Sequence, residues 1–172
     1  NPAAFRTVFD YDTNGYLATV TNPLSETTHT TLDAQGRLLA KTDALGNKTT
    51  YTYNSAGQIA TVVAARGNVV GANPADYTTR YTYDAAGNLR TTTDPLGRVT
   101  TNAYDRNNRL TSVTDPRGNT TSWAYDSDGN VASTTDAAGG VTSYGYDLAG
   151  RRTTMVTPRG NALPAGDRTN YT

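Results

Sequence analysis

Short segments rich in threonine and aromatic residues alternate along the chain with clusters of Asp, Asn and Gly. The segments are six or seven residues long, as in 98–104, 109–114 and 119–125, and these examples contain no proline. Thr and Tyr suit a pleated, half-buried surface, whereas Asp, Asn and Gly favour turns. No segment shows the 3.6-residue apolar period of a helix. The pattern therefore predicts an all-β fold, a continuous antiparallel meander of short strands.

The pattern repeats along the chain. Each unit holds an aromatic residue followed by Asp, two variable residues, Gly, a variable residue and Leu, and successive copies lie 21 residues apart except for one interval of 30. A fixed period of this length is typical of repeat architectures. We therefore expect residues 1–172 to be a single segment of a repeat array, with about seven repeats and truncated at both ends. The key position of the repeat is occupied by Tyr11, Leu32, Tyr53, Tyr83, Tyr104, Tyr125 and Tyr146.

Each repeat carries two turn signals, which predict two strands per repeat. The first turn opens directly after the key position, as in Asp84 to Gly87, and the second turn opens 11 residues after it, as in Asp94 to Gly97. Asp at the first position of a type I turn accepts a backbone hydrogen bond, and Gly at the fourth takes a positive φ. Asn108 replaces this Gly in one turn, and Asn tolerates that conformation best among the other residues. Ser25 replaces it in another.

The odd period restricts how the strands pair. Side chains alternate between faces along a strand, so the pairing register must step by one residue in each repeat for successive tyrosines to share a face. A G1 bulge in the first turn, with a plain four-residue second turn, provides this step and pairs Tyr83 with Leu89. An interior bulge in one strand provides it equally well. Either way, equivalent residues shift by about two positions per repeat, roughly 6–7 Å. This shift predicts a curved, spiralling sheet.

Composition favours a slice of a larger assembly over an isolated globule. Apolar residues make up 35% of the chain, and Tyr alone supplies 12 side chains, so the aliphatic supply for a core is thin. The formal net charge is zero, which argues against a nucleic-acid partner. No run of about 18 apolar residues predicts a membrane span. Cysteine is absent, which removes disulfides and thiolate chemistry.

Candidate catalytic and metal-binding residues are few. A Ser-His-Asp set would need His29, the single histidine, with Ser25 or Ser55, but His29 lies in an ordinary strand position. Glu26 is the single glutamate, and nearly every Asp opens a turn, so paired carboxylates are not indicated. The segment 126–130, with Asp126, Asp128 and Asn130, is the nearest approach to a calcium loop but lacks its ligand count. We predict no catalytic, cofactor-binding or metal-binding residues and no enzyme activity.

The aromatic rows allow two interpretations. Exposed tyrosine and tryptophan rings can stack on sugars, and Trp123 is the best candidate for such a carbohydrate-binding surface. We favour the alternative, in which the rings form cross-strand pairs that stabilise the sheet.

The unit at 81–89, Tyr-Thr-Tyr-Asp-Ala-Ala-Gly-Asn-Leu, followed by Thr-Asp-Pro-Leu-Gly-Arg at 93–98, closely resembles the YD repeat of RHS proteins. Seven copies cover nearly the whole chain, with departures that include Leu32 for Tyr and Asn54 for Asp. This family includes bacterial polymorphic toxins, insecticidal toxin-complex subunits and the animal teneurins. The resemblance implies that the repeats coil into a hollow β-shell, and that in bacterial members the shell encloses a C-terminal toxin domain.

From this resemblance we expect a structural segment of a shell that encapsulates a toxin or other cargo, secreted or at a bacterial cell surface. Its partners would be flanking repeats and the enclosed domain of the same polypeptide, with no nucleic acid. The family's self-cleavage motif is not present in these residues, so only the role in the shell is carried over. The alternative function is an extracellular adhesion or carbohydrate-binding surface, with a glycan as partner.

Two units have a longer second turn, after Gly67 and after Gly160, and both extensions begin Arg-Gly-Asn. They are either tolerated surface insertions or a higher-order feature that recurs at the same point of successive spiral turns. Their parent tyrosines, Tyr53 and Tyr146, lie 93 residues apart, which is four units.

Overall fold

The computed structural model describes residues 5–158, and within this range the chain forms an antiparallel sheet whose strand order follows the chain order. Two strands per repeat and the all-β class are confirmed. No helix among the described residues is long and apolar enough to span a membrane. The strands are β1 (Val8–Tyr11), β2 (Leu17–Thr21), β3 (Thr27–Leu32), β4 (Leu38–Thr42), β5 (Lys48–Tyr53), β6 (Ile59–Val63), β7 (Thr78–Tyr83), β8 (Leu89–Thr93), β9 (Val99–Tyr104), β10 (Leu110–Thr114), β11 (Thr120–Tyr125), β12 (Val131–Thr135), β13 (Val141–Tyr146) and β14 (Arg152–Val156).

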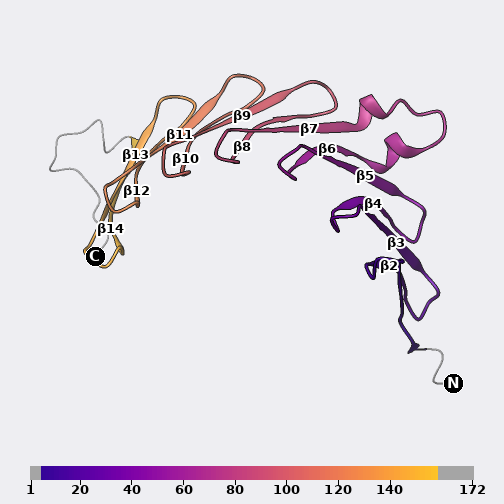
Figure 1. The fold of residues 1–172 in the computed structure, drawn as a ribbon. Helices are drawn as coiled ribbons and strands as arrows, with labels where there is room; N and C mark the ends of the chain where they lie inside the picture. The colour runs from indigo at the N-terminus through magenta and orange to yellow at the C-terminus, as the bar shows by residue number, and fades with distance from the viewer. Residues whose placement is uncertain (1–4, 159–172) are drawn as a thin grey trace. The chain divides into compact units, whose positions relative to one another are not determined.

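The sheet divides into two compact units. One unit covers residues up to 82 together with 92–98, and the other covers 83–91 together with the residues from 99 onward. Each unit is a meander in which every strand pairs with the strands next to it in sequence, as in β2–β3–β4 and β10–β11–β12. Within each unit, successive hairpins turn steadily relative to one another, so neither part of the sheet is flat (Figure 1).

The two turns of a repeat have the same backbone geometry. In the first turn at Asp105, the Asn108 amide donates to the Asp105 carbonyl (3.1 Å) and the Asp105 amide donates to the Arg109 carbonyl (3.0 Å). The second turn at Asp115 repeats both bonds, at 3.0 and 2.8 Å. Both are type I turns followed by a residue with positive φ, 60° at Asn108 and 86° at Gly118. The prediction that the two turns differ is therefore wrong.

The register step comes instead from an interior bulge in one strand, which is the second of the two predicted possibilities. Tyr104 faces Leu110 and Ala103 faces Ser112, so Thr111 is left between the two pairs. This Tyr–Leu pair matches the pairing predicted for Tyr83 with Leu89. An extra residue in one strand of an antiparallel pair restores the parity that the odd period requires. The corresponding bulge residues in other hairpins are Ala18, Leu39, Ala60, Ala132 and Thr153.

The bulge produces the predicted two-residue step. Asn102 pairs with Val113, and Val113 pairs with Thr121, so Asn102 is aligned with a residue 19 positions further on. The residue equivalent to Asn102 in the next repeat is Trp123, which lies 21 positions further on. Equivalent residues are thus displaced by two positions per repeat, or roughly 6–7 Å.

The sheet has almost no core of its own. Among the described residues, the buried hydrophobic side chains are Ala40 and Val156, and no large side chain is fully buried. Most strand residues are half-buried by their neighbours along and across the strands. Backbone hydrogen bonds and cross-strand contacts therefore carry the fold.

Ser25 adopts a left-handed backbone, with φ of 62°, where the other second turns described have Gly. A non-Gly residue in this conformation costs about 1 kcal/mol or slightly more. We expect Ser25→Gly to slow amide hydrogen exchange in the β2–β3 hairpin about fivefold, measured on the intact protein by mass spectrometry. Gly46→Ser is the matched control, because φ is 84° and a Cβ there meets no atom within 4 Å. It should speed exchange in the β4–β5 hairpin, and no change in either variant would contradict the argument.

Candidate functional site

The first turns of successive repeats lie at the same end of the strands within each unit. In most of them the side-chain carboxylate of the opening Asp stabilises the turn. In the turn after Tyr104, Asp105 Oδ1 accepts hydrogen bonds from the amides of Asn107 (2.8 Å) and Arg109 (3.0 Å). Asn54 does the same with its amide oxygen, accepting from Ala56 and Gln58. The turn therefore needs a short side chain with an acceptor oxygen and does not need a negative charge.

Hydrogen bonds hold the pKa of several turn carboxyls below the ordinary value. The side-chain amide of Asn88, followed by its backbone amide, lowers the pKa of Asp84. The side chain of Asn130 lowers the pKa of Asp126 in the same way, and outweighs a smaller rise caused by desolvation. Each of these bonds favours the charged form of the carboxylate.

The tyrosine at the key position supplies a hydrogen-bond donor beside the bulge of the preceding repeat. Its hydroxyl donates to the backbone carbonyl of the residue just before the bulge. This bond recurs from Tyr53 to Leu38 (2.8 Å), Tyr104 to Leu89 (3.1 Å), Tyr125 to Leu110 (2.8 Å) and Tyr146 to Val131 (3.0 Å). In these four repeats the tyrosine thus links its hairpin to the preceding one through a side-chain bond that the sheet ladder does not supply.

The one key position without a hydroxyl shows that the carbonyl before the bulge takes a donor from another side chain when the tyrosine is missing. Leu32 cannot donate, and the Leu17 carbonyl accepts a hydrogen bond from the hydroxyl of Thr30 instead. Thr30 lies two residues before Leu32 and therefore on the same face of β3. The bulge carbonyl is satisfied in this repeat by a different side chain.

Arginine at the residue after the first turn ties neighbouring repeats together in two places. Arg109 Nε pairs with Asp105 Oδ2 at 2.7 Å, and its guanidinium lies 4.4 Å from the centre of the Tyr125 ring. Arg37 repeats this arrangement with Asp33 and with Tyr53, at 4.7 Å. A guanidinium over an aromatic ring is attracted by its negative face. The side chains of Arg37 and Arg109 are 36% and 29% exposed, against 63% for Arg98 at a second turn, so these two contacts shield them from solvent.

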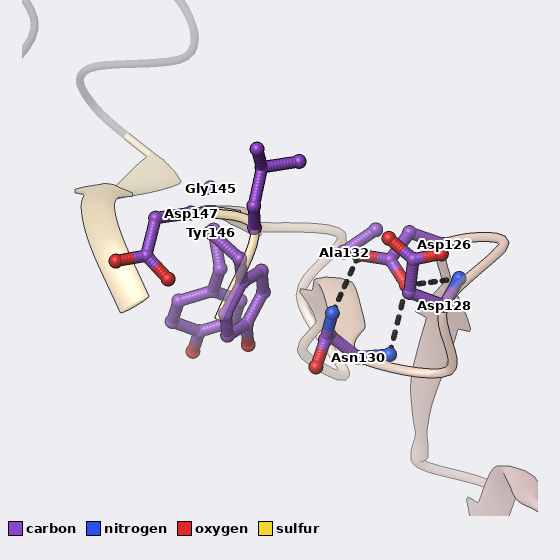
Figure 2. A pocket seen from close by; sticks show the side chains of 9 residues that line it. Asp126, Asp128, Asn130, Ala132, Gly145, Tyr146 and Asp147 are labelled. Atoms are coloured by element: carbon purple, nitrogen blue, oxygen red, sulfur yellow. Dashed lines mark hydrogen bonds between the residues drawn. The ribbon is translucent and has the colours of Figure 1, made fainter. Parts of the chain in front are cut away.

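A pocket of about 400 Å³ lies between two neighbouring first turns of the second unit (Figure 2). Asp126, Asp128 and Asn130 line it from one turn, and Tyr146, Asp147 and Leu148 line it from the next. Asn130 stands at the position that Arg109 occupies one repeat earlier. The shorter side chain leaves open the space beside Tyr146.

The structure does not bring the candidate catalytic residues together. His29 is exposed in β3, and its cross-strand neighbours are Thr19 and Thr42. Ser25 lies in a second turn and Ser55 in a first turn, which are at opposite edges of the unit. Glu26 accepts a hydrogen bond from the Asn22 side chain at 2.6 Å. Geometry therefore gives no support to a Ser-His-Asp set at His29.

The other two candidates take structural positions. Trp123 is half-buried in β11 and pairs with Thr134. Carbohydrate binding at its ring stays the alternative interpretation and is not tested by this geometry. Asp126 uses its oxygens within its own turn, accepting from the amides of Asp128 (3.0 Å) and Asn130 (2.8 Å) and from the Asn130 side chain (3.1 Å). Within residues 5–158, no group of three or more His, Cys, Asp and Glu side chains is placed to hold a metal ion.

Sequence reasoning missed the role of Arg-Gly-Asn in the extended second turn. The extended turn between β6 and β7 contains two short 3-10 helices, η2 (Ala65–Asn68) and η3 (Pro74–Tyr77). Asn68 donates to the carbonyls of Lys48 (2.8 Å) and Val63 (3.1 Å), which fastens the extension to two strands. Gly67 is buried, and a Cβ there would approach Tyr77 to 2.7 Å. The recurrence of the tripeptide was the available signal; the second copy, after Gly160, lies outside the described residues.

We expect Tyr125→Phe to destabilise the β9–β12 region by about 1 kcal/mol, because the Leu110 carbonyl loses its hydroxyl donor. The ring beneath Arg109 is retained, so the loss reports the hydrogen bond. Local hydrogen exchange should accelerate about fivefold in the intact protein. Tyr51→Phe is the matched control, since its hydroxyl makes no hydrogen bond in the described part of the chain. Equal effects of the two substitutions would contradict the role assigned to Tyr125.

Acid should loosen the Asp-opened turns. Hydrogen bonds from Asn88 hold the native pKa of Asp84 below its ordinary value of 3.8, so the contribution of this carboxylate to stability is complete above that value and is lost as pH falls through the native pKa. Exchange rates of the 83–89 turn, corrected for intrinsic pH dependence, should therefore rise below about pH 4. Asp84→Asn should flatten this dependence, because Asn54 opens an equivalent turn without titrating. An unchanged acid response in Asp84→Asn would refute the assignment.

Comparison with known proteins agrees with this geometry. The RHS Repeat family model matches residues 33–69, 65–99, 104–141 and 125–162. A search of curated proteins found no match. Among solved structures, the crystal structure of TcdB2-TccC3-Cdc42 matches 85% of the chain with a TM-score of 0.68 and 20% identity, which shows a shared fold. The crystal structure of TcdB2-TccC3 without its hypervariable C-terminal region matches 95% with a TM-score of 0.40 and 18% identity.

The chain spans 9% and 11% of the lengths of these two structures. The family model covers well over half of the chain. The chain is a structural repeat segment that belongs to the RHS repeat family.

Proposed function

We propose that residues 1–172 form one segment of a longer repeat array whose sheet winds into the wall of a container. The container would enclose a toxin or other cargo domain of the same polypeptide. Its contacts would be with flanking repeats and with that cargo, and the whole protein would be secreted or exposed on a bacterial surface. These residues would have no catalytic role.

The observation that carries the proposal is the two-residue register step in every hairpin pair for which the pairing is described. A constant step of this kind tilts the strands relative to the direction in which hairpins are added. A long array with this step winds, as the strands of a barrel do, and does not extend as a flat ribbon. The single-layer construction supports the same conclusion, because a sheet without its own core gains from contacts on both faces.

The wall is also suited to holding a polypeptide without binding it tightly. The formal net charge of the chain is zero. Threonine is the most frequent residue at the exposed strand positions, which also carry the cationic side chains Lys41, Lys48, Arg80, Arg90 and Arg152. The turn carboxylates are occupied by hydrogen bonds within their own turns, as at Asp105 and Asp126. A surface of balanced charge, whose turn carboxylates are already paired, exerts little net electrostatic attraction on an enclosed chain.

Electron cryomicroscopy of the complete protein tests this proposal. We expect a hollow shell with density inside it, and an empty shell of the same shape when the residues beyond the repeats are deleted. A solid rod, or a flat sheet, would contradict the proposal. A shell without internal density in the complete protein would refute encapsulation while leaving the repeat assignment unaffected.

A further inference from the structure

The space between neighbouring first turns is a slot that an arginine of the chain fills in two repeats. Arg109 enters it from one turn, is held by Asp105 at 2.7 Å, and covers the ring of Tyr125 on the next repeat. Arg37 fills the equivalent slot beside Asp33 and Tyr53. In both repeats the slot provides a carboxylate on one side and a tyrosine face on the other.

The slot between the next two turns has the same two walls without the arginine. Asp126 corresponds to Asp105, and Tyr146 corresponds to Tyr125. Asn130 replaces the arginine, and its side chain reaches only as far as Asp126 Oδ2, at 3.1 Å. Gly150, in the facing turn, has no side chain to occupy the space. The result is the pocket of about 400 Å³ between the two turns (Figure 2).

The repeat with Asn88 shows that an asparagine at this position does not by itself make an open slot. Asn88 donates to Asp84 at 3.0 Å and also to the side chain of Asn108 in the next turn, at 2.9 Å. The corresponding residue for Asn130 is Gly150, so this second bridge is absent. The pair Asn130 and Gly150 therefore distinguishes the pocket from the other slot with an asparagine.

The charges in the pocket favour a cation. Asp126, Asp128 and Asp147 all line it, and no lysine or arginine does. Asp147 is paired with Arg151 at 2.7 Å, whereas Asp126 has neutral hydrogen-bond donors. Arg152 lies 5.5 Å from the centre of the Tyr144 ring but is not a lining residue. Arg37 and Arg109 supply a cation to the equivalent slots of two other repeats, whereas no lining residue supplies one here.

We propose that the pocket between the turns at Asp126 and Asp147 binds the guanidinium group of an arginine side chain presented by another polypeptide segment. The ligand would stack on Tyr146 and pair with Asp126, as Arg109 does with Tyr125 and Asp105. Arginine fits better than lysine because its planar group forms forked hydrogen bonds while it stacks on a ring. Its bond to Asp126 replaces the one made by the Asn130 side chain.

Ligand-observed saturation-transfer NMR on the complete protein tests the proposal, with Nα-acetyl-arginine amide as the probe and Nα-acetyl-citrulline amide as its neutral control. We expect saturable transfer to the arginine probe and about tenfold weaker binding of citrulline, because the charge-assisted bond and the cation–π contact are both lost. Equal binding of the two probes would overturn the proposal.

Three variants place the binding at this pocket. Asn130→Arg should fill the slot from within the chain and remove the binding. Asn88→Arg is the matched control in another repeat and should leave it unchanged. Asp126→Asn keeps the acceptor that opens the turn, as Asn54 does, but removes the charge, and it should weaken arginine binding about tenfold with little effect on citrulline. If Asn130→Arg retains full binding, or if Asp126→Asn leaves it unchanged, the ligand binds elsewhere and the proposal is wrong.

Discussion

The bulge in each hairpin is the constraint on which the rest of the structure depends. An odd repeat of 21 residues can keep its tyrosines on one face only if the pairing register steps by one residue in each repeat, and the bulge provides this step. The bulge also creates a carbonyl that needs a donor. The hydroxyl of the next key tyrosine supplies it, as Tyr125 does for Leu110. Period, register step and the recurrence of tyrosine therefore have one physical cause.

This arrangement explains how a sheet without a core holds together. Buried apolar area is small among residues 5–158, so burial cannot provide most of the stability. Each repeat instead adds a similar set of bonds: two turns stabilised by an acceptor side chain, a tyrosine hydroxyl bond and, where arginine is present, a cation over a ring. Because the contacts between repeats join neighbouring repeats, stability grows with the number of repeats. The same regularity makes a local exception informative, as at Leu32 and at Asn130.

Much of the fold could be predicted from the sequence because turn chemistry is local. The Asp and Gly positions located both turns, and Asn108 and Ser25 take the left-handed backbone that their alignment with Gly indicates. The source of the register step could not be decided, since a turn and an interior bulge satisfy the same parity. The Tyr–carbonyl bond and the pocket beside Asn130 depend on which side chains meet across repeats. The clamp formed by Asn68 likewise depends on contacts with Lys48 and Val63 that lie distant in sequence.

The most direct test of this account is a pair of cysteine cross-links across the bulge. The chain has no cysteine, so no background disulfide forms. With the bulge, Asn102 lies opposite Val113, and Asn102→Cys with Val113→Cys should oxidise rapidly because directly opposed residues suit disulfide geometry. Asn102→Cys with Ser112→Cys should remain reduced, because Ser112 then points to the other face. A cross-link in the second pair and none in the first would show a continuous ladder without the bulge, and would contradict the account.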